Sequence, residues 1–171
     1  MRVRRSTDDD WPAILDVHRR AFGGEVEPRM ADAVRRSDGW VPELSLVAEL
    51  DGVVAGHVLT SWVGLEGSSR RLLQTGPIGV LPEHQGRGLG SALMRATLDG
   101  VRAFGEPLVL LEGDPGFYGR FGFVRADEHG LVPPPEALYD WAFQVAVLDD
   151  SAPLPRGRVV YPPTFPREEP A

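Results

Sequence analysis

The sequence contains no cysteine and no lysine, so its 18 basic residues are all arginine. Without thiols the chain has no disulfides, no zinc–thiolate site and no cysteine that could carry an acyl group. Without lysine it has no nucleotide-hydrolysing P-loop, because that loop places a lysine on the phosphates. No apolar run approaches the ~20 residues that span a bilayer, and the basic N-terminus lacks the apolar core of a signal peptide. The cytoplasm is therefore the expected location.

Positive charge is also scarce. The net charge is −7, and no basic block follows a pattern suited to a phosphate backbone, so we predict no nucleic-acid partner and no membrane partner. An acidic surface favours a cationic substrate such as an amine, although the same charge also serves simply to keep a protein soluble. His18, His57, His84 and His129 are scattered without metal-ligand spacing, which predicts no metal site.

The length of 171 residues and the order of the expected elements predict a single α/β domain over residues 1–171. Expected strands cover residues 1–5, 44–50, 53–63, 71–80, 107–111, 141–148 and 159–161. Expected helices cover residues 11–22, 28–36, 88–101 and 115–121. This order predicts one mixed sheet with helices on its faces. The end of the chain, residues 162–171, is predicted to be a loose tail.

The sharpest feature is Gln85-Gly86-Arg87-Gly88-Leu89-Gly90, which lies between a predicted strand and a predicted helix. Its three glycines remove the side chains that would keep an anion away from the backbone. The start of the helix adds unpaired N–H groups and a partial positive charge, and Arg87 adds a charged donor. The loop therefore predicts a pyrophosphate site, although a glycine-rich helix cap without a ligand can have the same sequence. Its G-x-G-x-G spacing differs from the G-x-G-x-x-G of dinucleotide folds.

Residues 74–90, QTGPIGVLPEHQGRGLG, resemble the pyrophosphate-binding motif of the GNAT superfamily of N-acetyltransferases, written Q/R-x-x-G-x-G/A, with Gln85, Gly88 and Gly90 in its fixed places. GDPGFYGRFGF, at residues 113–123, is similar to the second half of the family's acetyl-CoA site. GRVVYPPTF, at residues 157–165, is similar to the ending of a small bacterial branch. The resemblance implies an acetyl-CoA-dependent N-acetyltransferase whose mixed sheet is splayed between its fourth and fifth strands.

The resemblance also implies a place for the cofactor. The backbone N–H groups of residues 86–90 would bind the pyrophosphate of acetyl-CoA. The backbones of Ile78 and Val80 would pair with the amides of the pantetheine arm as an added strand does. Gly79 suits a bulge that splays this strand away from residues 108–111, and the acyl group would lie in the opening.

Tyr118 is the candidate general acid. Acyl transfer to an amine leaves a thiolate that must be protonated, and the ordinary pKa of tyrosine lies close to that of a thiol. Tyr118 also matches the tyrosine that many family members place near the cofactor sulfur. Because Phe117, Phe121 and Phe123 surround it in the sequence, the alternative is an aromatic core residue.

The general base is less sharply indicated. Glu112 ends the strand opposite the acyl opening and is the candidate base, acting through water. Glu83 and His84 flank the phosphate loop and are alternatives that fit contact with cofactor or solvent as well. Because cysteine is absent, direct attack of the amine within a ternary complex is favoured over a covalent intermediate.

The expected acceptor is a small-molecule amine or a protein amino group, and a homodimer is compatible with the sequence. The alternative function is an acyl-CoA-binding sensor or regulatory domain without turnover, because an intact phosphate loop alone establishes only binding. Turnover of acetyl-CoA with a panel of amines distinguishes the two.

Overall fold

One β-sheet passes through the molecule in the computed structural model, which describes residues 1–165 of the 171. Its strands are β1 (Arg2–Arg5), β2 (Trp40–Leu50), β3 (Val53–Leu65), β4 (Ser68–Val80), β5 (Leu108–Glu112), β6 (Val124–Arg125), β7 (Leu131–Val132), β8 (Phe143–Val147) and β9 (Gly157–Val160). They follow the order β1-β2-β3-β4-β5-β8-β6, and β9 pairs with both β3 and β7. The β4–β5 pair is parallel within an otherwise mostly antiparallel sheet, as predicted for a mixed sheet.

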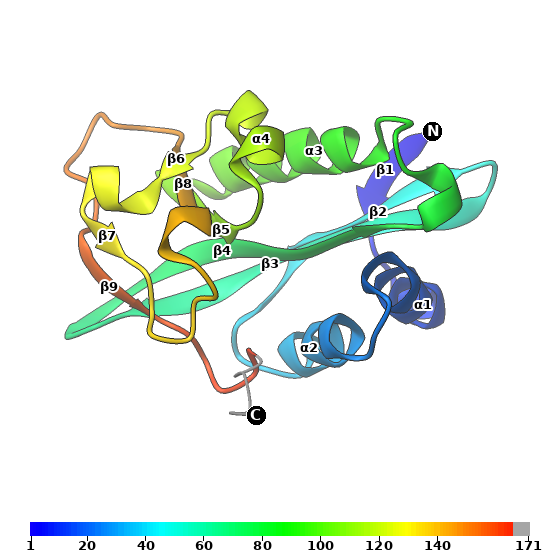
Figure 1. Cartoon of the computed structure of the whole chain (residues 1–171), viewed down its shortest axis with the longest axis horizontal. Coiled ribbons are helices and arrows are strands. Elements are labelled where there is room, and N and C mark those ends of the chain that lie inside the picture. Colours follow the sequence, from blue (N-terminus) through cyan, green and yellow to red (C-terminus); the bar gives the residue numbers. More distant parts are fainter. Residues whose placement is uncertain (166–171) are drawn as a thin grey trace.

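Helices cover both faces of this sheet. They are α1 (Trp11–Phe22), α2 (Val26–Arg35), α3 (Leu89–Phe104) and the single turn α4 (Pro115–Tyr118). Helices α1 and α2 lie on one face, whereas α3 and α4 lie on the other (Figure 1). Each long helix buries one apolar stripe, for example Leu93, Leu98 and Val101 of α3. The predicted α/β fold with helices on both faces is confirmed.

Strands β4 and β5 separate part of the way along β4. They pair at three positions, from Leu73 opposite Val109 to Thr75 opposite Leu111. Beyond Thr75, β4 continues to Val80 and pairs, among the described residues, with β3 alone. Between Ile78 and Thr75, two residues of β4, Gly76 and Pro77, face one residue of β3, so the strand carries a bulge there. The splay is confirmed, but its predicted cause is wrong, because the pairing is regular at Gly79.

Gly79 serves the packing of α1 instead. A Cβ atom at Gly79 would lie 3.0 Å from His18 Nδ1 and 3.3 Å from the Cβ of Ala21, so only glycine lets α1 approach β4 this closely. His18 Nε2 lies 2.7 Å from His57 Nδ1, and His57 Nε2 lies 3.0 Å from Ser45 Oγ. Both histidines are fully buried. Burial lowers the pKa of His18 to about 4, and burial followed by His18 lowers the pKa of His57 well below its usual range.

The buried histidine pair predicts a loss of stability in mild acid. The unfolded state takes up protons near the ordinary pKa of histidine, ~6.5, whereas folded His18 resists protonation until about 4, so the free energy of unfolding falls as the pH drops between these values. For His18 alone we expect a loss of about 2 kcal/mol from pH 7 to pH 5. Urea unfolding at both pH values measures this loss. The variant His18→Gln/His57→Gln should lose most of the pH dependence and His129→Gln should keep it; an unchanged dependence in the double variant would contradict the assignment.

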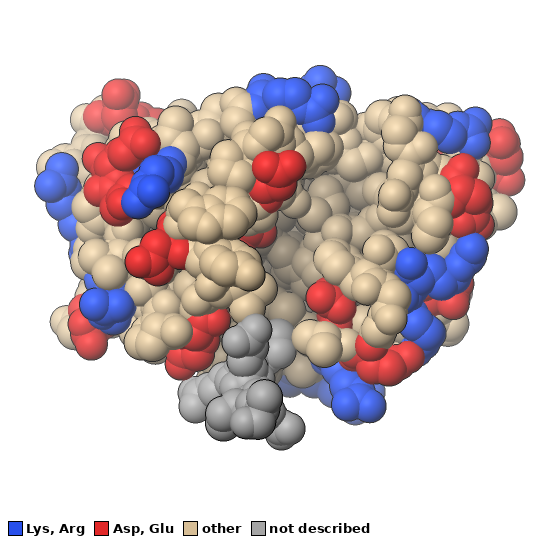
Figure 2. Space-filling model, in the orientation of Figure 1, with Lys and Arg blue, Asp and Glu red and all other residues tan. Residues whose placement is uncertain are grey.

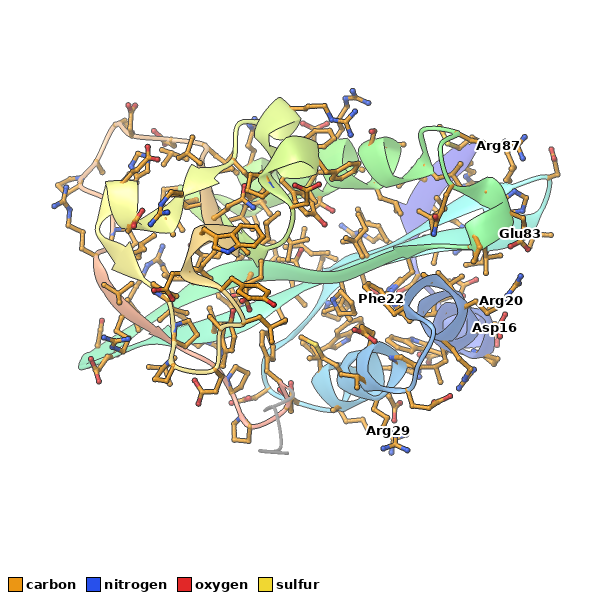
Figure 3. All side chains as sticks on the ribbon, in the orientation of Figure 1. Asp16, Arg20, Phe22, Arg29, Glu83 and Arg87 are labelled. Atoms are coloured by element: carbon orange, nitrogen blue, oxygen red, sulfur yellow. The ribbon has the colours of Figure 1, made fainter. Side chains whose placement is uncertain are left out.

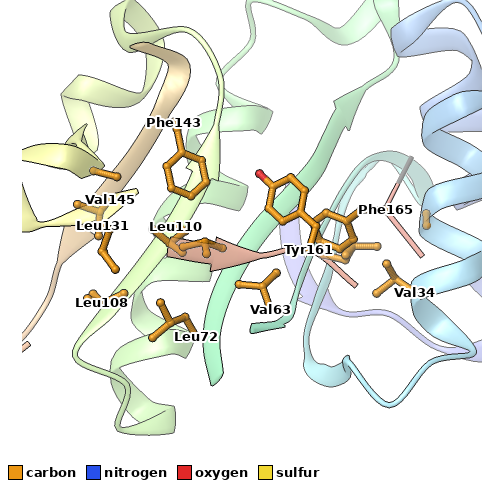
Figure 4. Packing of buried hydrophobic residues seen from close by; sticks show 14 of the residues in the cluster. Val34, Val63, Leu72, Leu108, Leu110, Leu131, Phe143, Val145, Tyr161 and Phe165 are labelled. Atoms are coloured by element: carbon orange, nitrogen blue, oxygen red, sulfur yellow. The ribbon is translucent and has the colours of Figure 1, made fainter. Parts of the chain in front are cut away.

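The chain after β9 packs between α2 and the sheet. Tyr161 and Phe165 have ring centroids 4.7 Å apart and belong to the same buried cluster as Val34 of α2 and Val63 of β3 (Figure 4). Because Phe165 is anchored in this cluster, a loose tail cannot begin at residue 162 as predicted, and residues 166–171 lie outside the described residues. The prediction of one domain over residues 1–171 extends beyond that range and stays a prediction. Within the described part of the chain, no helix has the length and apolar character to cross a membrane.

Candidate active site

The glycine-rich loop leads directly into the N-terminus of α3. Gly86 and Gly88 have φ angles of 71° and 85°, a left-handed conformation that glycine adopts without strain. Successive backbone N–H groups in such a turn form a concave anion site, and the 16-residue helix α3 adds its positive end. The side chain of Leu89 is buried in the core, so Leu89 can offer a ligand only its backbone. This geometry supports the predicted pyrophosphate site.

Gln85 joins this loop to the end of β4. Its side-chain Nε2 donates a hydrogen bond to the backbone carbonyl of Val80 at 3.1 Å. The N–H of Leu81 donates to Ala55 on β3, and backbone groups alternate in direction along a strand. The backbone groups of Val80 and Ile78 therefore face away from β3, toward the gap, which supports their predicted pairing with a pantetheine arm. Gln85 itself holds the loop in place through Val80.

The charged residues around the loop pair with one another at the surface. Arg87 donates to His84 Nδ1 at 3.1 Å, and Arg20 of α1 donates to both carboxylate oxygens of Glu83 at 3.0 and 2.9 Å. Figure 3 shows Arg20 and Glu83 side by side at the end of the sheet where the loop lies. Glu83 is thus occupied by an exposed ion pair that links α1 to the loop, and it is poorly placed to act as a base.

The ring of Tyr118 packs directly against Gly113. A Cβ atom at Gly113 would fall 2.2 Å from Cε2 of Tyr118, so the ring occupies the space of a missing side chain. The ring also makes edge contacts with Phe117 and Phe123, at centroid distances of 4.9 and 6.0 Å. Burial, and to a lesser degree Asp114, raises the pKa of Tyr118 to about 12. The hydroxyl therefore stays protonated at neutral pH, as a proton donor must.

Glu112 belongs to a hydrogen-bond network that the sequence did not indicate. Gln74 Nε2 donates to the hydroxyl of Tyr161 at 2.7 Å, and that hydroxyl donates to Glu112 Oε2 at 2.6 Å. The N–H of Leu138 donates to Glu112 Oε1 at 3.1 Å. Burial, and then Glu112, raises the pKa of Tyr161 well above its usual range, so its phenol stays neutral. Glu112 thus ties the C-terminal segment to the end of β5, and its role as a base stays a prediction.

These parts surround one cleft of about 2310 Å³ that passes through the gap between β4 and β5. On the α3–α4 face its lining includes residues 84–86, residues 88–91, Phe117 and Tyr118; on the α1–α2 face it includes Phe22, Met30 and Phe165. Figure 2 shows this face of the molecule hollowed near its centre, with acidic side chains around the hollow. Pockets for a single drug-sized ligand measure roughly 300–1,000 Å³, so the cleft has room for a large and a small ligand together. Within residues 1–165, no three histidine, aspartate or glutamate side chains group as a metal site.

The sequence belongs to the GNAT family of acetyltransferases. The family model for the acetyltransferase (GNAT) domain matches residues 2–126, which include the glycine-rich loop and Tyr118. The N-acetyltransferase YhbS of Escherichia coli K12, itself uncharacterized, is 35% identical over 156 residues, which cover 89% of this chain and 90% of YhbS. YjhQ of the same organism is 32% identical over 73% of this chain and 71% of its own. The resemblance read from residues 74–90 is confirmed, and the protein is an N-acetyltransferase by family.

Solved structures agree with this assignment. The structure of E. coli YhbS in complex with CoA has a TM-score of 0.88 and 33% identity, and the match covers 98% of this chain and 93% of YhbS. A GNAT acetyltransferase of Brucella melitensis in complex with acetyl-CoA has a TM-score of 0.79 and 32% identity, with 96% and 97% covered. Two structural relatives of nearly equal length thus contain the predicted cofactor or its product.

Proposed function

We propose that this protein moves the acetyl group of acetyl-CoA to a primary amine by direct attack of the amine within a ternary complex. The observation that carries the proposal is the cleft that passes between β4 and β5 and is lined from both faces of the sheet. A donor that enters from the α3–α4 face and an acceptor that enters from the α1–α2 face would meet at the gap.

The donor site follows from the backbone. The N–H groups of residues 86–90 bind the pyrophosphate, and the outward-facing backbone of Ile78 and Val80 pairs with the amides of the pantetheine arm. This path leads along β4 to Thr75 and Leu111, where β4 and β5 begin to separate. The thioester lies there, within the gap.

A primary amine is mainly an ammonium ion at neutral pH, so it first gives one proton to solvent. The reaction of the neutral amine then needs two proton transfers. The amine nitrogen attacks the thioester carbonyl, so the C–N bond forms and the C–S bond breaks. Glu112 takes the proton of the amine through water, and Tyr118 gives its proton to the departing thiolate, which leaves as the thiol of CoA. Because cysteine is absent, no cysteine acyl-enzyme intermediate can form.

Initial rates tell this mechanism from its alternatives. With acetyl-CoA and a primary amine varied together, double-reciprocal plots should intersect, as a ternary complex requires. Parallel lines would indicate a covalent acyl-enzyme and contradict direct attack. Saturable binding of acetyl-CoA with no amine-dependent release of CoA, across a broad panel of amines, would show a sensor domain instead of an enzyme.

A further inference from the structure

The half of the cleft on the α1–α2 face has two apolar walls. Phe22 and Val26, at the end of α1 and the start of α2, are 47% and 55% exposed and line one wall. Leu138, which is 60% exposed, and Phe165 line the other. Soluble proteins gather exposed apolar side chains of this size mainly where a ligand or partner covers them. Leu138 and Phe165 also lie beyond residue 126, where the match to the family model ends, so this wall is not part of that model.

The charge of the same half is negative. Glu27 and Glu112 line it. Arg29 is the one basic side chain that lines this half within the described residues, and it extends from α2 away from the sheet (Figure 3). Two carboxylates beside two apolar walls favour a ligand that carries positive charge on an apolar body.

The gap between β4 and β5 contains a hydrogen-bond acceptor without a donor, which could bind the charged amine group. Gln74 is 5% exposed and lines the cleft where β4 and β5 separate. Its Nε2 is committed to Tyr161, whereas its Oε1 accepts no hydrogen bond from any described residue. A buried carbonyl oxygen left unpaired costs about 1–3 kcal/mol, so a donor N–H at this point would be stabilising. Glu112, joined to Gln74 through Tyr161, places a carboxylate at the same position.

We propose that the acceptor is a primary amine with an apolar body, of the alkylamine or arylalkylamine class. This inference rests on the proposed function and specifies its second substrate. The amine nitrogen lies between Gln74 Oε1 and Glu112, and the apolar body lies between the walls formed by Phe22 and Val26 and by Leu138 and Phe165. An amino alcohol would place its hydroxyl group against an apolar wall without a hydrogen-bond partner. An α-amino acid would bring its carboxylate next to Glu112.

Two matched pairs of amines test the class. Pentylamine and 5-aminopentan-1-ol share a five-carbon chain, but 5-aminopentan-1-ol ends in a hydroxyl group; phenethylamine and phenylalanine share a ring, but phenylalanine carries a carboxylate. With acetyl-CoA saturating, kcat/KM should be about tenfold or more higher for the first member of each pair. Equal or reversed preferences, with turnover present, would overturn the acceptor class and leave the proposed function standing. No turnover with any amine despite bound acetyl-CoA would overturn both.

Variants of the walls test the binding mode. Phe22→Ser and Leu138→Ser should each raise KM for phenethylamine about tenfold and leave KM for acetyl-CoA unchanged. Phe104→Ser is the matched control, because Phe104 is 42% exposed on α3 and outside the cleft lining. Thermal unfolding confirms that each variant is folded. If both wall variants bind phenethylamine as tightly as the control does, the apolar body lies elsewhere and the proposed mode is overturned.

Discussion

Gly88→Leu should weaken binding of acetyl-CoA by about 100-fold or more while the protein stays folded. That factor corresponds to about 3 kcal/mol, or roughly two hydrogen bonds to a charged group. At a φ of 85°, a side chain at this position meets no protein atom within 4 Å, so it projects into open space at the start of α3. In our account that space holds the pyrophosphate. Isothermal titration with acetyl-CoA and with CoA measures the loss.

Gly105→Leu is the matched control for this variant. Gly105 ends the same helix with a φ of 83°, and a side chain there also meets nothing within 4 Å. Each substitution should therefore cost about 1 kcal/mol of stability for the left-handed conformation. Only Gly88→Leu should affect the cofactor. If the two variants bind acetyl-CoA with equal affinity, the pyrophosphate does not bind at the start of α3.

Tyr118→Phe should lower kcat about 100-fold and leave the affinity for acetyl-CoA unchanged. The substitution removes a hydroxyl whose pKa is raised to about 12 and keeps the ring in its contacts with Phe117 and Phe123. Because a raised pKa keeps the phenol protonated, Tyr118 should cause no loss of rate between pH 7 and pH 10 in the wild-type enzyme. Tyr139→Phe, at an exposed tyrosine stacked on Trp141, is the control and should keep full activity.

Gly113→Ala provides a second test of Tyr118 because it displaces the ring instead of removing the hydroxyl. Its kcat should fall as in Tyr118→Phe, and the two substitutions combined should cost little more than either alone. Gly119→Ala, where a Cβ atom meets nothing within 4 Å, should have no effect. Full activity in both Tyr118→Phe and Gly113→Ala would contradict the role of general acid and show that Tyr118 is an aromatic core residue.

Local patterns allowed much of the fold and the donor site to be predicted. The loop from Gln85 to Gly90 could be recognised because its residues are consecutive. A glycine-rich loop at the start of a helix offers backbone N–H groups to an anion whatever the rest of the sequence is. The strands around Asp51-Gly52 and the apolar stripe of α3 are also local. The splay between β4 and β5 was expected from the family resemblance, whereas the bulge at Gly76 and Pro77 is recognisable only from the pairing of β4 with β3.

Contacts between distant segments account for what the sequence did not indicate. Gln74 and Tyr161 are 87 residues apart, and Tyr161 and Glu112 are 49 apart, so no spacing rule joins them. The pair His18 and His57 forms only when α1 packs on β3, across 39 residues. In the sequence, Gly113 does not stand out from the other glycines of its motif. Only the structure shows that Gly113 leaves room for the ring of Tyr118.

The most direct measurement is a calorimetric titration of the purified protein with acetyl-CoA, with NAD in parallel. We expect saturable binding of one acetyl-CoA per chain, weakened by Gly88→Leu and unaffected by Gly105→Leu, and no response to NAD. Absence of binding to both acetyl-CoA and CoA would contradict the proposed donor site and leave a GNAT fold whose glycine-rich loop holds no cofactor.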